Sequence, residues 1–167
     1  MLERSYQTRQ GTIRYWVSAP GPRGTALVFL PGLTADHRLF EKQTAYFEGK
    51  YPLLVWDAPG HAASWPFRLH FTLWDKAGWL DEILQKEGFS RPVIIGQSMG
   101  GYVAQVFDVL FPGCACGIVS VDSAPLGRDY YKRWELACLP FVTRMFYLYP
   151  WATLKKTSAE GNAATPE

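Results

Sequence analysis

Apolar residues gather in four short continuous runs, separated by longer stretches with helical spacing. The runs cover residues 26–30, 53–56, 93–95 and 118–121. Short runs that are apolar throughout are typical of strands covered on both faces, whereas strict alternation indicates a half-exposed strand. The pattern therefore predicts the strands of a buried, mostly parallel sheet.

Three further stretches fit helices: residues 39–47, 73–87 and 102–111. The second is the best delimited, because Thr72 can cap its start and Gly88 can end it. The predicted inward faces carry Trp74, Ala77, Leu80, Ile83 and Leu84 in the second helix, and Val103, Val106, Phe107 and Leu110 in the third. Strands alternating with helices predict an α/β fold with right-handed crossovers and helices on both faces of the sheet.

The remaining segments extend this core at both ends. Residues 5–8 and 12–17 predict an antiparallel hairpin on the sheet edge. Beyond residue 125 the chain becomes rich in aromatic residues and is interrupted by prolines. We expect a core over residues 1–125, part of a helical cap over 126–157, and a polar tail over 158–167.

Each apolar run is followed by residues that do not suit a core. These are Pro31-Gly32, Asp57, Gly96-Gln97-Ser98 and Asp122. Parallel strands end at the same edge of a sheet, and ligands bind in the crevice there. The four strand ends therefore predict one functional crevice.

Ser98 carries the sharpest local signal. A serine on a tight strand-to-helix turn needs small neighbours two positions away on either side, and Gly96 and Gly100 meet that need. Such a turn would present the hydroxyl to the crevice and leave the Met99 N–H free to stabilise an oxyanion. The alternative is an ordinary glycine-rich connection.

With these motifs in this order, the sequence resembles the α/β-hydrolase superfamily, the capped kind that includes small carboxylesterases, proline iminopeptidases and carbon–carbon bond hydrolases. The resemblance runs from Thr12 to the cap. It implies that the Leu33 N–H is a second oxyanion donor, unless Pro31-Gly32 is simply a turn. The segment 57–64 resembles the family's loop after the fourth strand, although Ala62 stands where glycine is usual.

Asp57 and His61 lie in that loop, where they are better explained as a self-bonded structural turn than as catalytic groups. The resemblance implies a serine hydrolase that acts on a small ester or related carbonyl compound through an acyl-enzyme, with no metal or organic cofactor. The family's acid and histidine follow the serine, but His37, His61 and His70 all precede Ser98.

Asp122 is therefore either the acid or a cap for the turn that follows it. We expect a C-terminally truncated chain that is inactive or impaired as an isolated fragment. A natural short paralogue that has lost catalysis and a non-catalytic small-molecule binding module on the same fold are the alternatives. Nucleotide binding is disfavoured, because the sequence has neither Gly-x-Gly-x-x-Gly after an early strand nor Gly-Lys-Ser/Thr.

Charge and composition limit the partners, the location and the cysteine chemistry that can be expected of the protein. A net charge of +2 gives no reason to expect nucleic-acid or membrane partners. Without a secretory signal or an apolar span, a cytoplasmic protein is expected. Three cysteines favour small buried side chains over disulfides or a metal site. The aromatic residues from 130 to 151 would line an apolar pocket under a lid or pack inside the cap, and an uncovered sheet edge could support a dimer.

Overall fold

The computed structural model describes residues 1–18, 24–68, 70–132, 134, 138 and 153. The chain divides into two compact units, Met1–Pro125 and Leu126–Glu167. In the second unit a short 3-10 helix, η3, covers Arg128–Tyr130. Most of the predicted cap and the whole polar tail lie outside the described residues. The account that follows therefore concerns the first unit.

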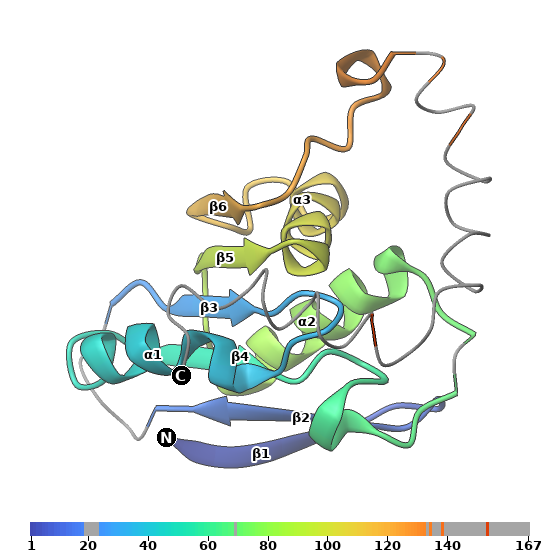
Figure 1. The fold of residues 1–167 in the computed structure, drawn as a ribbon. Helices are drawn as coiled ribbons and strands as arrows, with labels where there is room; N and C mark the ends of the chain where they lie inside the picture. The colour runs from blue at the N-terminus through green and yellow to red at the C-terminus, as the bar shows by residue number, and fades with distance from the viewer. Residues whose placement is uncertain (19–23, 69, 133, 135–137, 139–152, 154–167) are drawn as a thin grey trace. The chain divides into compact units, whose positions relative to one another are not determined.

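Six strands form one sheet, and their order in space differs from their order in the chain (Figure 1). The strands are β1 (Leu2–Gln7), β2 (Thr12–Val17), β3 (Leu27–Leu30), β4 (Leu53–Trp56), β5 (Val93–Gln97) and β6 (Gly117–Val121). The spatial order is β1-β2-β4-β3-β5-β6. β3 pairs in parallel with β4 and β5, and β5 with β6, whereas β1–β2 and β2–β4 are antiparallel. This confirms the mostly parallel sheet with a hairpin at one edge.

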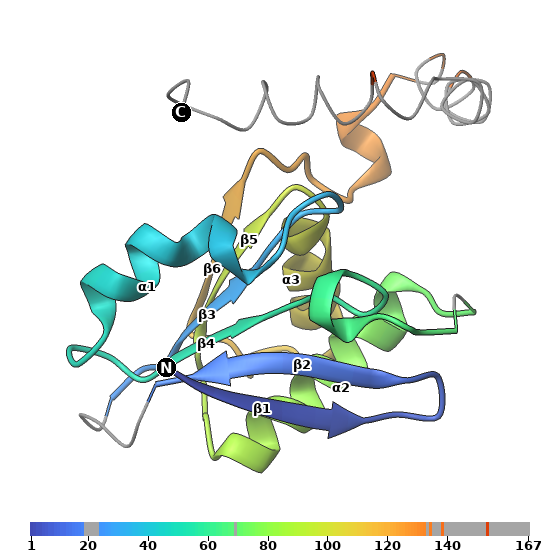
Figure 2. The ribbon, with the colours of Figure 1, turned by 60° about the horizontal axis from the view of Figure 1, so that its bottom comes forward.

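Helices cover both faces of this sheet (Figure 2). Here α2 (Leu73–Glu87) and α3 (Met99–Leu110) lie on one face, and α1 (Glu41–Phe47) lies on the other. Two 3-10 helices, η1 (His37–Phe40) and η2 (Ala62–Ser64), follow β3 and β4. The larger core cluster lies beneath α2 and α3, and a smaller one beneath α1 contains Phe29, Phe40, Leu53 and Val55.

The ends of α2 follow from its sequence as predicted. The Thr72 side chain accepts the N–H of Asp75, and the Asp75 carboxylate accepts the N–H of Thr72, which forms a capping box. Gly88, with φ of 72°, ends the helix in the left-handed conformation that glycine adopts without a steric cost.

The predicted inward face of α2 is wrong at its first residue. Trp74 is 51% exposed, whereas Lys76 is only 4% exposed. The buried stripe continues through Ala77 and Leu80, so it is rotated away from Trp74. In α3, likewise, Val103 and Phe107 are buried but Leu110, in the last turn, is exposed. The apolar positions with helical spacing in the sequence thus continue beyond the turns of α2 and α3 that are buried against the sheet.

The sheet ends at β6, whose outer residues are open to solvent. Val119 and Val121 are both more than two-fifths exposed, at 46% and 43%. Cys114, Cys116 and Cys138 are also exposed, so the expectation that the cysteines are buried is wrong. The first two lie in the bend before β6, outside the packed elements. Among the described residues, no helix is both long and apolar enough to cross a membrane.

Candidate active site

Ser98 occupies the turn that connects β5 to α3. Its backbone has φ of 49° and ψ of −115°, a conformation that residues with a side chain rarely adopt. The Ser98 N–H donates to the carbonyl of Val121 at 2.9 Å, and the Ser98 carbonyl accepts the N–H of Gly101 at 3.0 Å. Ser98 is partly buried, and its hydroxyl has no hydrogen-bond partner in the described part of the chain. The bend that the sequence suggests is therefore present, and the catalytic role of Ser98 remains a prediction.

Glycines let the strands and helix approach closely enough to form this turn. A Cβ on Gly100 would overlap the backbone carbonyl of Leu30 in β3, and a Cβ on Gly96 would overlap the backbone of Gly100. A Cβ on Gly101 would meet the side chain of Ser123. Backbone cannot give way as a flexible side chain can, so side chains at positions 96 and 100 would dismantle the turn.

Leu33 and Met99, the predicted oxyanion donors, both flank Ser98. A Cβ on Gly32 would lie 3.2 Å from the Cβ of Ser98, so the loop after β3 passes beside the serine. Met99 is the first residue of α3 and has no intrahelical acceptor for its N–H. The Leu33 N–H donates to no acceptor among the described residues. Both N–H groups are thus available for an external acceptor.

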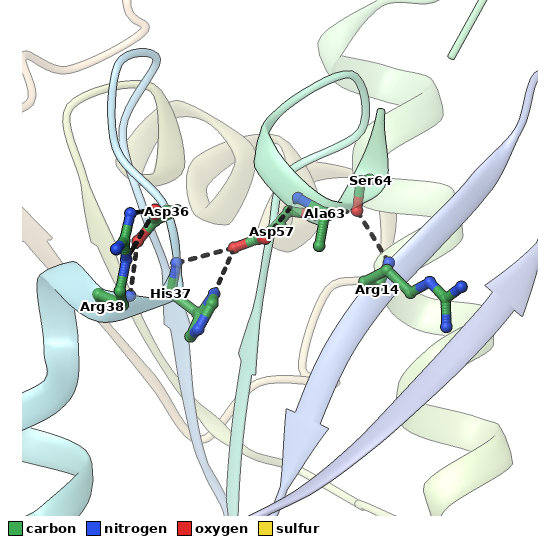
Figure 3. A network of polar contacts seen from close by, with 7 residues as sticks. All are labelled: Arg14, Asp36, His37, Arg38, Asp57, Ala63 and Ser64. Atoms are coloured by element: carbon green, nitrogen blue, oxygen red, sulfur yellow. Dashed lines mark hydrogen bonds and ion pairs between the residues drawn. The ribbon is translucent and has the colours of Figure 1, made fainter. Parts of the chain in front are cut away.

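A buried carboxylate ties the loop after β3 to the loop after β4 (Figure 3). Asp57, which is fully buried, accepts the N–H of His37 at 2.8 Å and the N–H of Ala63 at 2.9 Å. The ring Nδ1 of His37 lies 2.8 Å from the same carboxylate, and this ring stacks on Trp16 with centroids 3.7 Å apart. A carboxylate oxygen can accept this hydrogen bond when Nδ1 carries the proton.

The same network extends to both sides. Ser64 donates its hydroxyl to the Asp57 carbonyl at 2.8 Å and accepts the N–H of Arg14 at 2.8 Å, which fastens η2 to β2. At the other end, Asp36 caps η1 and holds Arg38 at 2.6 Å. The hydrogen bond from Arg38 lowers the pKa of the Asp36 carboxyl.

The interpretation of Asp57 as a structural turn is therefore incomplete. The residue does bond within its own loop, through Ala63, but its histidine partner is His37 and not His61. His61 instead contacts the Pro59 carbonyl at 3.1 Å. The sequence does contain a signal for the pairing, because β3 and β4 are adjacent parallel strands whose following loops must lie side by side.

Asp122 follows β6 in a backbone conformation with φ of 51° and is exposed. It makes no hydrogen bond or ion pair with another described residue. The turn after β6 is held instead by Ser123, whose hydroxyl donates to the Ser98 carbonyl at 2.7 Å. Among the described residues, Asp122 therefore bonds no histidine and does not cap the turn that follows it, and its role as the acid remains a prediction.

Lys76 is a charged residue near the site that the sequence did not single out. Its Nζ lies 3.0 Å from the sulfur of Met99, and burial lowers the pKa of Lys76 to about 8.

No group of three or more His, Cys, Asp or Glu among the described residues could hold a metal ion.

Comparison with known proteins places these features in a family context. The model of the alpha/beta hydrolase fold family matches residues 25–134. The chain is 35% identical over 98 residues to the magnesium-chelatase 30 kDa subunit of Rhodobacter capsulatus, covering 58% of this chain and 34% of that protein. It is 31% identical over 91 residues to 3-oxoadipate enol-lactonase 2 of Acinetobacter baylyi, covering 52% and 33%. The chain thus spans about a third of the length of these curated relatives.

Solved structures share the fold at lower identity. Est816, described as an N-acyl homoserine lactone degrading enzyme, matches with a TM-score of 0.68 and 20% identity over 82% of this chain and 52% of its own. A thermophilic esterase from Thermogutta terrifontis matches with a TM-score of 0.64 and 21% identity, over 77% and 49%. At these identities the likeness shows the fold alone.

Proposed function

The chain belongs to the alpha/beta hydrolase fold family, and from this premise we propose that it carries the nucleophile of a serine hydrolase that acts on a small ester or a related carbonyl compound. One observation supports this proposal above the others. Ser98 sits on a strained turn, and neither its hydroxyl nor the two N–H groups beside it have a hydrogen-bond partner among the residues that the structure describes. Strain of this kind concentrates at functional sites.

The proposed chemistry follows from this arrangement. A base removes the Ser98 proton as the oxygen attacks the substrate carbonyl, and the N–H groups of Leu33 and Met99 stabilise the tetrahedral oxyanion. Collapse of that intermediate expels the alcohol and leaves an acyl-serine, which water hydrolyses to the acid and the free enzyme. The three histidines of the sequence all precede Ser98, so we propose that the base comes from a segment beyond the 167 residues.

A nucleophile that needs no base tests the site in the chain itself. The Ser98→Cys variant supplies a thiol, which is partly ionised at neutral pH and more so at a helix N-terminus. We expect p-nitrophenyl acetate to acylate this thiol at least about tenfold faster than an exposed one, with a burst of one equivalent of p-nitrophenol. The background should carry serine at positions 114, 116 and 138, where the natural cysteines are exposed.

The matched control is Ser90→Cys in the same background, because Ser90 is an exposed loop residue between α2 and β5. Equal acylation rates of the two thiols would contradict the proposed nucleophile.

Turnover is a separate test. The 167-residue chain alone should barely hydrolyse the ester. The chain extended by its downstream coding sequence should turn the ester over, and a fluorophosphonate should label it. Ser98→Ala should abolish both the turnover and the labelling.

A second candidate is a non-catalytic small-molecule binding module on the same fold. It is favoured by the relative at 35% identity, whose name is that of a chelatase subunit and not of a hydrolase. A binder needs the crevice but not the reactive serine. The longer chain would then stay unlabelled by the fluorophosphonate, even though it folds.

A further inference from the structure

Lys76, near the start of α2, is the most unusual charged residue in the described core. Only 4% of it is exposed. Its Nζ lies 3.0 Å from the Met99 sulfur and 5.3 Å from the centroid of the Phe71 ring. A thioether sulfur is a weak acceptor, and moving an ammonium out of water is costly unless it is paired. Among the described residues, this buried cation therefore has only weak partners.

No carboxylate of the described residues compensates this charge. Every acidic side chain of α2 has another partner: Asp75 bonds Thr72, Asp81 bonds Gln85, Glu82 bonds Tyr6 and Glu87 bonds Tyr15. The one acidic residue of α3, Asp108, is exposed and lies nine positions beyond Met99. Consistent with this, desolvation alone lowers the pKa of Lys76, with no contribution from a neighbouring acid.

The position of Lys76 relates it to the candidate active site. Its partner Met99 directly follows Ser98, and the Met99 N–H is one of the two proposed oxyanion donors. Met99 also begins α3, so the positive end of that helix dipole lies at the same place. The ammonium thus contacts the side chain of the residue that follows Ser98, and the positive helix terminus lies at the backbone of that same residue.

We propose that Lys76 is an electrostatic positioning residue of the Ser98 site: its buried ammonium holds the Met99 side chain and places an uncompensated positive charge behind the oxyanion donor, where it stabilises an anion at position 98. The inference rests on the proposed function, since only a reaction with a developing oxyanion uses such a charge. A fixed charge in a poorly solvated site acts strongly and needs no reorganisation during the reaction.

The acidity of a thiol at position 98 reports this charge directly and requires no turnover. In the Ser98→Cys variant with serine at positions 114, 116 and 138, where the natural cysteines are exposed, we expect Lys76→Met to raise the thiol pKa by about one unit, which corresponds to about tenfold less thiolate at neutral pH. The pKa is measured from the pH dependence of alkylation by iodoacetamide. Methionine keeps a similar length and suits the apolar surroundings.

The control is Lys86→Met in the same variant, because Lys86 lies on the same helix but is exposed and bonds the Ser5 carbonyl. It should leave the thiol pKa unchanged. Structural damage is separated from charge by the melting temperature, which we expect Lys76→Met to raise. A thiol pKa that is the same with and without Lys76 would overturn the inference.

A second measurement covers the case in which the double variant fails to fold. With ¹³C-labelled methionine methyl groups in the unaltered chain, the Met99 signal should shift with pH around a midpoint of about 8, the pKa of Lys76. A Met99 signal that does not titrate would also overturn the inference. If Lys76→Met raises the thiol pKa but p-nitrophenyl acetate does not acylate the thiol at position 98, the proposed function is contradicted. The electrostatic effect of Lys76 on position 98 is then still supported.

Discussion

The imidazole of His37 and the carboxylate of Asp57 lie 2.8 Å apart, and the backbone N–H of His37 reaches the same carboxylate oxygen. One buried acid thereby fixes both the backbone and the side chain of the segment that follows Leu33. The pair sits on the α1 side of the sheet, against Trp16. Its geometry orients a loop of the candidate site.

Breaking this pair should destabilise the fold. We expect Asp57→Asn to lower the free energy of unfolding by about 2 to 4 kcal/mol, since it removes a buried charge that two N–H groups and an imidazole satisfy. Urea denaturation measures the loss. His61→Ala removes a contact to the Pro59 carbonyl and no other hydrogen bond of the His61 ring to a described residue, so it should cost less than about 0.5 kcal/mol. Similar losses in both variants would argue against a special role for Asp57.

Glycine-to-alanine substitutions at positions 100 and 78 should change the free energy of unfolding in opposite directions. At Gly100 the new methyl group would overlap the Leu30 carbonyl, so we expect a loss of at least about 3 kcal/mol or insoluble protein. At Gly78, inside α2, a Cβ meets nothing within 4 Å, so the same change should stabilise by about 0.5 to 1 kcal/mol through helix propensity. Thermal denaturation of both variants checks the sign. A stable Gly100→Ala protein would contradict the tight approach of α3 to β3.

Lys76 should make stability depend on pH in an identifiable range. Its pKa is about 8 in the folded chain against 10.5 for the ordinary group, so between these values the unfolded chain binds more protons and stability rises with pH. Below pH 8 the buried charge costs up to about 3 kcal/mol. Lys76→Met should therefore be the more stable form at pH 7, by an amount that shrinks as the pH approaches 10.5.

The measurement is the difference in urea unfolding free energy between Lys76→Met and the unaltered chain, from pH 6 to pH 10. Other titrating groups cancel in this difference, because both proteins contain them. A difference that does not change with pH would mean that the lysine keeps its ordinary pKa in the fold.

The capping box of α2 should contribute measurably. Thr72→Ala removes the side-chain acceptor for the Asp75 N–H and should cost about 1 kcal/mol in urea denaturation. Hydrogen bonds from Thr72 lower the pKa of Asp75. The stabilisation from the ionised Asp75 carboxylate is therefore complete above the unfolded-state pKa of Asp75. It is lost as the pH falls through the lower pKa that Asp75 has in the folded chain. An Asp75→Asn variant should lose the acid-range dependence while keeping the helix.

The hydrophobic pattern was sufficient for the architecture. Runs that are apolar throughout occur where both faces of a strand are covered, and β3 to β6 lie within about two residues of the predicted positions. The turn at Ser98 was also predictable, because its glycines meet backbone and no other residue fits there. Helical geometry in α3 begins at Met99, directly after the strained serine and three residues before the start that the sequence predicts.

Pairings between distant residues were not predictable in the same way. His37 and Asp57 are 20 residues apart, and their contact depends on how two loops turn after adjacent strands. A lysine on an amphipathic helix is ordinarily solvated, so the sequence does not predict a buried Lys76. The rotation of α2 decides whether Lys76 or Trp74 is covered. Both features depend on tertiary packing, which a local pattern does not encode.

The close approach of β3, β5 and α3 beneath Ser98 has a consequence for directed evolution of this chain. Any codon change at positions 96 and 100 that alters the amino acid introduces at least a Cβ, and backbone already occupies that space. Random libraries would therefore lose clones at these two positions whatever activity is selected. Diversity is better directed to the exposed loop around Leu33, where new side chains can border the serine without disturbing the layer on which it stands.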